Sequence, residues 1–362
     1  MDEAELVQRT KSGELLAGLD CTGLQLAGAD LAGGIFEKVD FSGANLDGAN
    51  LRETTFLSCN LSGVSAKGAN LRHATLQGCT GRAMDLEGAE LPIARLMGGD
   101  FSAATFVGAQ LLATVFAKLD LRMARFEKAN LDRTQLVEVE LDGVSFQGAK
   151  MKHTVLHAAD LRQCSFRATK LDTVVMVKSN LAGMDLSFMD LELCQFMDAD
   201  LTGANLRESN LTQCNFKSAV MAGANLEGAR APRAMFAQAN LERARLVRLS
   251  AREALFAEVN AREADFSNAD LQMAVFLRAS CQDANFKNAD LTYAELSHAD
   301  LSDADLSSAT LYRARLHRIK DDGASFGASR LLAFGTDGDI AEAEEWQPPK
   351  RPPAAPQRGA GS

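Results

Sequence analysis

A large apolar residue occupies nearly every fifth position of this 362-residue chain, from Leu16 to Leu331, and the register continues without insertion or deletion. Two residues before each of these centres the side chain is small, usually alanine, and Asp, Asn, Ser or Thr commonly lies between them. A period of five matches neither the 3.6-residue repeat of an amphipathic helix nor the two-residue alternation of a strand. The pattern therefore predicts a chain that turns a corner after every five residues.

The phenylalanines indicate how many sides each coil has. Residues two apart in an extended segment share a face, so the small residue and the centre should both point inward. Fifteen of the nineteen Phe residues are centres whose numbers end in six. In a four-sided coil these centres form two opposite sides, so that large rings face each other across the axis. Three sides would scatter the same rings around the coil, and we therefore expect four.

The repeats resemble those of the pentapeptide-repeat family, whose signature is A(D/N)LXX. Typical stretches are ANLDGANLRE at 44–53 and ADLTGANLRE at 199–208, and the resemblance covers about 14–333. It implies an all-β fold, a right-handed quadrilateral parallel β-helix (solenoid) of about sixteen coils with short terminal helices. Residues 1–13 are predicted to form an N-terminal capping helix, which begins at Asp2 and ends at Gly13.

The C-terminal end departs from the repeat. Residues 334–346 are predicted to form a C-terminal cap, in which a helical segment brings Ile340 and Trp346 over the last coil. Residues 347–362 hold five of the seven prolines and are expected to be a disordered Pro-rich tail. We expect no membrane span and no cleavable signal peptide, hence a bacterial cytoplasmic protein, with export by another route left open.

Nothing in the repeats has the pattern of a catalytic or metal site. All seven cysteines occupy inward positions, where Cys acts as a small apolar residue. We expect the five histidines to lie scattered on outward positions of distant coils: His73, His153, His157, His298 and His317. No nucleophile is expected to have a base within reach. We therefore predict no enzyme activity, no catalytic residues, no metal site and no cofactor.

The charge pattern argues against nucleic-acid binding. The net charge is −10, but residues 1–60 sum to −6 and residues 101–180 to +3. A nucleic-acid binder would need one basic stripe. Some members of the family bind DNA gyrase by imitating DNA with acidic columns, and here arginines such as Arg122, Arg162 and Arg243 interrupt any such column. We expect no direct nucleic-acid binding.

One side of the square is more apolar than the others. We call "apolar side" the side whose centres are residues 36, 56, 76 and so on to 316. The outward positions flanking these centres are apolar in 16 of 30 cases, against 9 of 96 on the other three sides. Strand propensity alone would not favour one side. The candidate interaction face is Val115, Val137, Val155, Val175, Val177, Met197, Met235, Leu255, Val275 and Leu277.

A second departure from the repeat concerns inward positions. Met84, Met184 and Met189 occupy positions that are normally small, while other inward positions have lost volume, as at Ala66 and Gly81. We interpret these changes as adjustments of packing rather than as a hinge or a binding pocket.

The function favoured by the sequence is a non-catalytic protein-binding scaffold or adaptor that presents a rigid rod with one apolar side. Its partner would be another protein, or a second copy of this chain. One alternative is a DNA-mimic inhibitor or protector of DNA gyrase. Another is an adaptor or effector-loading accessory protein of type VI secretion, because residues 1–31 resemble pentapeptide-repeat proteins found beside such systems.

Overall fold

The computed structural model describes residues 2–346, and the disordered tail predicted for 347–362 lies outside this range. The chain begins with helix α1 (Glu3–Lys11) and ends with the 3-10 helix η1 (Ala328–Leu332) and helix α2 (Gly338–Glu345). Between them lie β1 (Leu15–Ala17), β2 (Ile35–Glu37), β3 (Thr55–Leu57), β4 (Thr75–Thr80), β5 (Arg95–Asp100), β6 (Val115–Asp120), β7 (Gln135–Val137), β8 (Lys150–Lys152), β9 (Val155–His157), β10 (Lys170–Asp172), β11 (Asp305–Leu306) and β12 (Ser325–Phe326).

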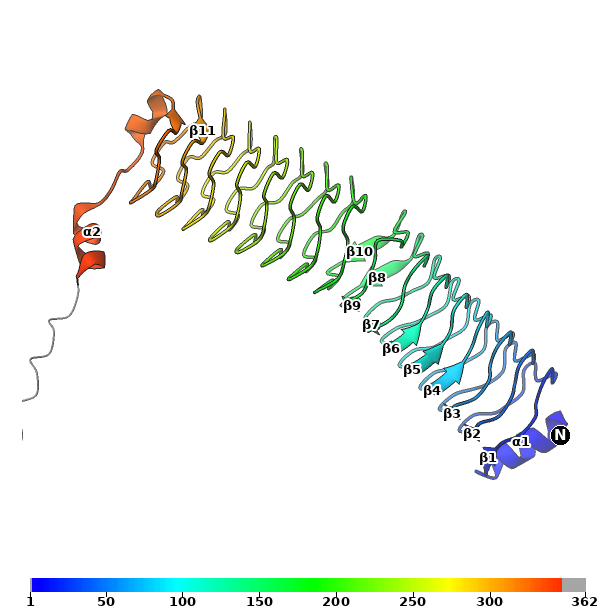
Figure 1. Ribbon diagram of the computed structural model, residues 1–362. Helices are drawn as coiled ribbons and strands as arrows, with labels where there is room; N and C mark the ends of the chain where they lie inside the picture. Colours follow the sequence, from blue (N-terminus) through cyan, green and yellow to red (C-terminus); the bar gives the residue numbers. More distant parts are fainter. Residues whose placement is uncertain (1, 347–362) are drawn as a thin grey trace, which may run out of the picture.

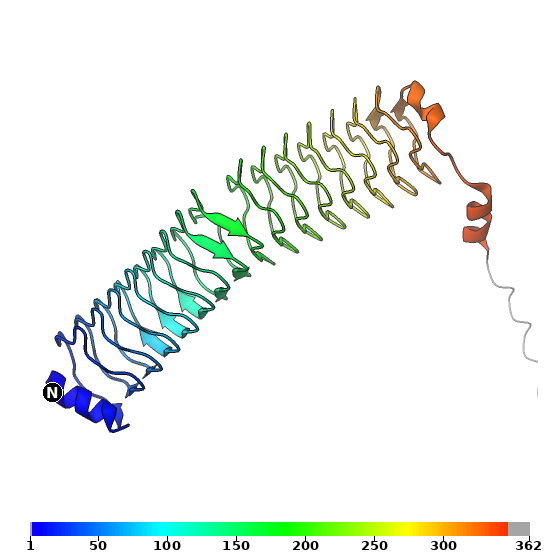
Figure 2. The same cartoon turned by 180° about the vertical axis from the view of Figure 1, so that it is seen from behind.

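The repeating part is a parallel solenoid of about sixteen four-sided coils (Figure 1). The paired residues of successive coils lie twenty positions apart in the sequence and pair in parallel, as Leu15 does with Ile35 and Asn45 with Ser65. Twenty residues per coil and five per side confirm the four-sided prediction. Strands β1 to β7 and β9 form one eight-stranded sheet, which lies on the apolar side. Figures 1 and 2 show that the stack bends near β8 and β10.

The core confirms the interpretation of the phenylalanines. Rings on the same side stack from coil to coil, with centroids 4.7 Å apart for Phe106 and Phe126. Rings on opposite sides meet edge to face across the axis, as Phe106 and Phe116 do at 5.6 Å. Both arrangements are favourable for aromatic pairs. The centres and the small residues before them form a single buried cluster along the rod.

The corners explain why a five-residue repeat can close. At most corners the third residue after the centre donates its N–H to the carbonyl of that centre, as Ala29 does to Leu26 at 3.0 Å. The residue before this donor has a positive φ, which is 71° at Gly28 and 58° at Glu53. Glycine adopts this conformation without the cost that a β-carbon adds. The frequent Gly at this position is therefore a corner residue.

Helix α1 covers the first coil. Its N-terminus is capped by the side chain of Asp2, which accepts a hydrogen bond from the N–H of Glu5 at 2.9 Å. Leu6 is fully buried and belongs to the same core cluster as Leu16. The helix thus places one apolar side chain on the open end of the stack, where unpaired strand edges would otherwise be exposed.

Two expectations for the C-terminal end are wrong. Leu331, the last predicted centre, lies in η1 and is 90% exposed, because the chain leaves the coil after Phe326. Arg315 then pairs with Phe334, which is nineteen residues later instead of twenty. Ile340 and Trp346 do not cover the last coil either, because they are 51% and 69% exposed. Among residues 2–346, no helix is long and apolar enough to cross a membrane.

Candidate interaction surface

The structure places all ten residues of the candidate interaction face on one side of the rod. Val115, Val137 and Val155 lie in β6, β7 and β9 of the eight-stranded sheet, and the other seven lie where the same side continues toward the C-terminus. Figure 1 shows this sheet along the inner, concave side of the bent stack. Nine of the ten side chains are half-buried, and Met235 is 39% exposed.

The candidate interaction face is divided into two parts. Asn215 and Lys217 occupy the two outward positions of a single coil in the middle of the side. They separate an N-terminal patch from a C-terminal patch. The N-terminal patch is Val115, Val137, Val155, Val175, Val177 and Met197, and the C-terminal patch is Met235, Leu255, Val275 and Leu277. Within the patches the residues touch in register, since Val155 bridges Val175 and Leu255 bridges Val275.

Helix α2 lies beside the C-terminal patch. A cavity of about 750 Å³ opens between them, with Leu277 on the coil side and Phe334 and Ile340 on the side of the C-terminal segment. Arg318 ties the helix to the last coils by donating to the carbonyl of Ala341 at 2.8 Å. The C-terminal segment therefore borders the candidate face and does not cap the end of the stack.

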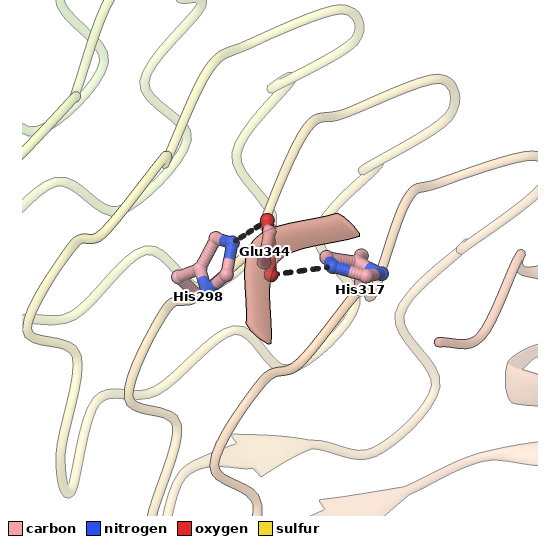
Figure 3. A group of neighbouring side chains, drawn as sticks. All are labelled: His298, His317 and Glu344. Atoms are coloured by element: carbon pink, nitrogen blue, oxygen red, sulfur yellow. Dashed lines mark hydrogen bonds and ion pairs between the residues drawn. The ribbon is translucent and has the colours of Figure 1, made fainter. Parts of the chain in front are cut away.

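Glu344 of α2 lies between two histidines of neighbouring coils (Figure 3). Its two carboxylate oxygens lie 3.1 Å from Nε2 of His298 and 3.3 Å from Nε2 of His317. The two rings are 5.3 Å apart, so the expectation that all five histidines lie on distant coils is wrong for this pair. Their separation of 19 residues, close to one coil of twenty, is the sequence signal that could have indicated their proximity.

These three side chains also form a group that could hold a metal ion, the one such group among residues 2–346. The hydrogen bonds favour a different role. The backbone N–H of Asp337 donates to Nδ1 of His317 at 3.1 Å, so the proton of the neutral ring is on Nε2 and points to Glu344. A metal ion on Nε2 would require that proton to move to Nδ1, against the N–H of Asp337. The arrangement is therefore suited to holding α2 by hydrogen bonds.

Acid is expected to release α2 from the coils. Partial burial alone would raise the pKa of Glu344, but hydrogen bonds from His317 and His298 prevail and keep this pKa below its ordinary value. Such a carboxylate stabilises docking above its unfolded pKa, and the contribution is lost as pH falls through the lowered pKa. The anisotropy of Trp346, the single tryptophan, should therefore drop on acidification.

Two variants test this prediction. Glu344→Gln should give low Trp346 anisotropy already at neutral pH, whereas Glu342→Gln, at an exposed carboxylate of the same helix, should behave like the wild type. Equal anisotropy profiles for the wild type and Glu344→Gln would contradict the assigned role.

Several surface arginines pair with nearby carboxylates. Arg122 pairs with Asp120, Arg162 with Asp160 and Arg243 with Glu263. These contacts place a cation beside the carboxylates of each region, so no uninterrupted acidic column runs through these coils. Burial raises the pKa of the Cys194 and Cys281 thiols to about 12, which disfavours a nucleophilic role for these two residues.

Comparisons with known proteins agree with this architecture. Family models described as pentapeptide repeats match residues 194–230, 234–272 and 279–318, and one described as a pentapeptide repeat region matches 29–106 and 99–176. No curated protein sequence matches the chain.

Several solved structures are similar in fold. Full-length QnrB1, a plasmid-mediated fluoroquinolone resistance protein, is 18% identical over 56% of this chain and 94% of its own, with a TM-score of 0.30. HetL, involved in heterocyst differentiation regulation in the cyanobacterium Nostoc sp. strain PCC 7120, is 24% identical over 87% of this chain and 96% of its own, with a TM-score of 0.18. At these identities and TM-scores, the functions of QnrB1 and HetL are not transferred to this chain. The two family models together cover most of the repeating coils, and the protein belongs to the pentapeptide-repeat family.

Proposed function

We propose that this protein is a non-catalytic scaffold that binds another protein, or a second copy of itself, through the two patches of its apolar side. The observation that carries the proposal is the concentration of half-exposed apolar side chains on one side of an otherwise polar rod. Apolar groups gathered on a surface in this way mark interaction sites. The concave curvature of this side favours a partner with a convex surface (Figure 1).

Val175 and Val177 test the proposal because both lie in the N-terminal patch and flank the buried centre Met176. Val175→Lys/Val177→Lys should leave the fold intact and weaken association by about 2 kcal/mol or more, which is roughly thirtyfold. Light scattering over a range of concentrations measures self-association, and a pull-down measures capture of a partner.

The matched control is Ala182→Lys/Ala222→Lys, which adds the same charge at half-buried positions on the neighbouring side. This variant should associate as the wild type does. If the two double variants and the wild type show the same mass and the same partner recovery, the apolar side is not the interface.

The alternative, gyrase binding by DNA mimicry, predicts a different result. It requires a run of carboxylates that replaces phosphates, whereas arginines such as Arg122 and Arg162 neutralise neighbouring acids here. Purified protein should therefore leave DNA supercoiling by gyrase unchanged at micromolar concentration. Inhibition that persists in the Val175→Lys/Val177→Lys variant would favour the mimic.

A further inference from the structure

The pairing between coils fails on two neighbouring sides at one junction. Along most of the rod, residues at equivalent positions bridge from coil to coil, as Ser145 does with Ser165 and Asp185 with Asn205. Among the described residues the bridge from Glu140 to Asp160, on another side, is also missing. Between the first two pairs, the described residues lack the expected bridge from Ser165 to Asp185, and likewise that from Lys170 to Asp190. The other two sides stay paired, through Val155 with Val175 and Asp160 with Asn180.

The result is a wedge-shaped opening in the stack. Figures 1 and 2 show neighbouring coils spread apart on the convex side beside β10, more widely than elsewhere along the rod. We call the coil segment 164–171 the lower lip and the segment 184–190 the upper lip. A cavity of about 680 Å³ lies between them. Strand β10 pairs with β8 on one edge only, so its other edge faces this opening.

Backbone groups on both lips have no protein partner in the described part of the chain. One coil earlier, the N–H of Phe146 donates to the backbone carbonyl of Ser165 at 2.9 Å, and the N–H of Gly148 donates to the backbone carbonyl of Arg167 at 3.0 Å. The equivalent N–H groups of Phe166 and Ala168 on the lower lip donate to no protein atom there.

On the upper lip, the N–H groups of Asp185 and Asp190 are also without a protein acceptor among residues 2–346. In a closed junction these four donors would pair with the carbonyls of the opposite lip. The opening therefore presents two edges with the hydrogen-bonding pattern of a β-strand.

Two methionines line the opening, and we attribute the separation of its edges to them. Met184 and Met189 occupy consecutive inward positions of the upper lip, where most coils have Ala. Their longer side chains hold the lips apart, and apolar atoms are reached from outside as a result: Phe166 and Leu171 are each 6% exposed, while nearly all other centres are at most 2% exposed. Met84 occupies the same kind of position in a coil with intact bridges, so one methionine alone does not open the stack.

The lips carry opposite charges. Arg167 and Lys170 lie on the lower lip, and neither makes an ion pair within the described residues. Asp185 and Asp190 lie on the upper lip, where they accept hydrogen bonds from Asn205 at 2.9 Å and from Asn210 at 2.8 Å. A side chain placed between Lys170 and Asp190 should therefore both accept and donate. The amide of asparagine does both.

We propose that the opening binds an extended peptide segment of a partner protein, which adds as a parallel strand between the two lips. Backbone hydrogen bonds to both edges supply affinity, and alternate side chains supply specificity, as in other cases of strand addition. The fitting segment has a small and a large apolar residue two apart, which reach Phe166, Met184 and Met189, with asparagine between them. This site is separate from the apolar side and does not depend on the function proposed for that side.

A peptide with the sequence ANLDGANLRE, residues 44–53 of this chain, is a suitable probe because it has the required pattern twice. The control peptide is the same sequence with N-methyl groups on both Asn amides, which removes two backbone donors and keeps every side chain. The unmodified peptide should bind with 1:1 stoichiometry in calorimetry, and the control at least about tenfold more weakly. Equal binding of the two peptides would overturn strand addition.

Hydrogen exchange locates the site. In the free protein the amides of Phe166, Ala168, Asp185 and Asp190 should exchange much faster than those of Phe146 and Gly148, and saturating peptide should slow them. Amides that are already protected without peptide, or unchanged at saturation, would overturn the proposal.

Met184→Ala/Met189→Ala should close the junction. Alanine is the usual residue at these positions, so the variant should fold, protect the four amides without peptide and bind the probe at least about tenfold more weakly. Met84→Ala is the matched control and should match the wild type. A double variant that stays open and binds equally would refute the role of the methionines. Val175→Lys/Val177→Lys should bind the peptide normally, which separates this site from the apolar side.

Discussion

Phe256→Ala is expected to destabilise the surrounding coils by about 3–5 kcal/mol. The ring of Phe256 is fully buried between those of Phe236 and Phe276, at centroid distances of 4.8 and 4.6 Å, and meets Phe266 edge to face at 5.8 Å. Its removal leaves a cavity that three rigid rings cannot fill without losing their own contacts. Because each coil contacts only its neighbours, the loss should be local.

Native-state hydrogen exchange measures this effect where a single unfolding transition would not. Protection should fall for coils between residues 236 and 276 and stay unchanged in the first coils. Phe188→Ala, at a ring that is 70% exposed, should change stability by no more than about 0.5 kcal/mol. A loss below about 1 kcal/mol for Phe256→Ala would mean that the stacked rings do not form a rigid core.

Leu6→Asp is expected to undock α1 from the first coil. Leu6 is fully buried, and a carboxylate cannot stay there without a partner. The helix should therefore leave the stack, at a cost of at least about 2 kcal/mol of buried apolar contact. This exposes Leu16 and the free edge of β1, and an open β edge favours pairing between molecules.

The variant should show fast exchange in the first coil and concentration-dependent growth in light scattering. Ala4→Asp, at an exposed position in the first turn of α1, is the matched control and should behave as the wild type. If Leu6→Asp and Ala4→Asp scatter equally, α1 does not protect the end of the stack.

The repeat made the fold predictable from sequence. Once Ala44 and Leu46 are assigned to the inside, counting in steps of five assigns each later residue of the repeats to a side of the coil. The phenylalanine stacks and the apolar side follow from this count. The C-terminal segment has no such register. Helix α2 therefore docks through Glu344 and Arg318 in a way that no periodicity indicates, and the expected contact of Trp346 with the last coil was wrong.

The opening at β10 shows a different limit. Met184 and Met189 stand out in the sequence because they occupy inward positions that usually hold alanine. From the sequence alone we interpret them as an adjustment of core packing. Met84 fits that interpretation, because the bridges between its coil and the neighbouring coils remain intact. We infer that two methionines on consecutive sides of one coil need more volume than the core provides. The combined effect of the two is not visible when each position is considered alone.

The pairing of residues twenty positions apart also determines the direction in which each surface points. Deleting one pentad between Met197 and Met235 would keep the alternation of small and large inward residues, yet it would turn the C-terminal patch and the downstream phenylalanine stacks by a quarter turn around the long axis relative to the N-terminal patch. Deleting a whole coil would instead draw the patches together by about 4.8 Å without turning either. Insertions or deletions of twenty residues thus preserve the direction in which all later surface residues point around the rod axis. Insertions or deletions of five, ten or fifteen residues change that direction.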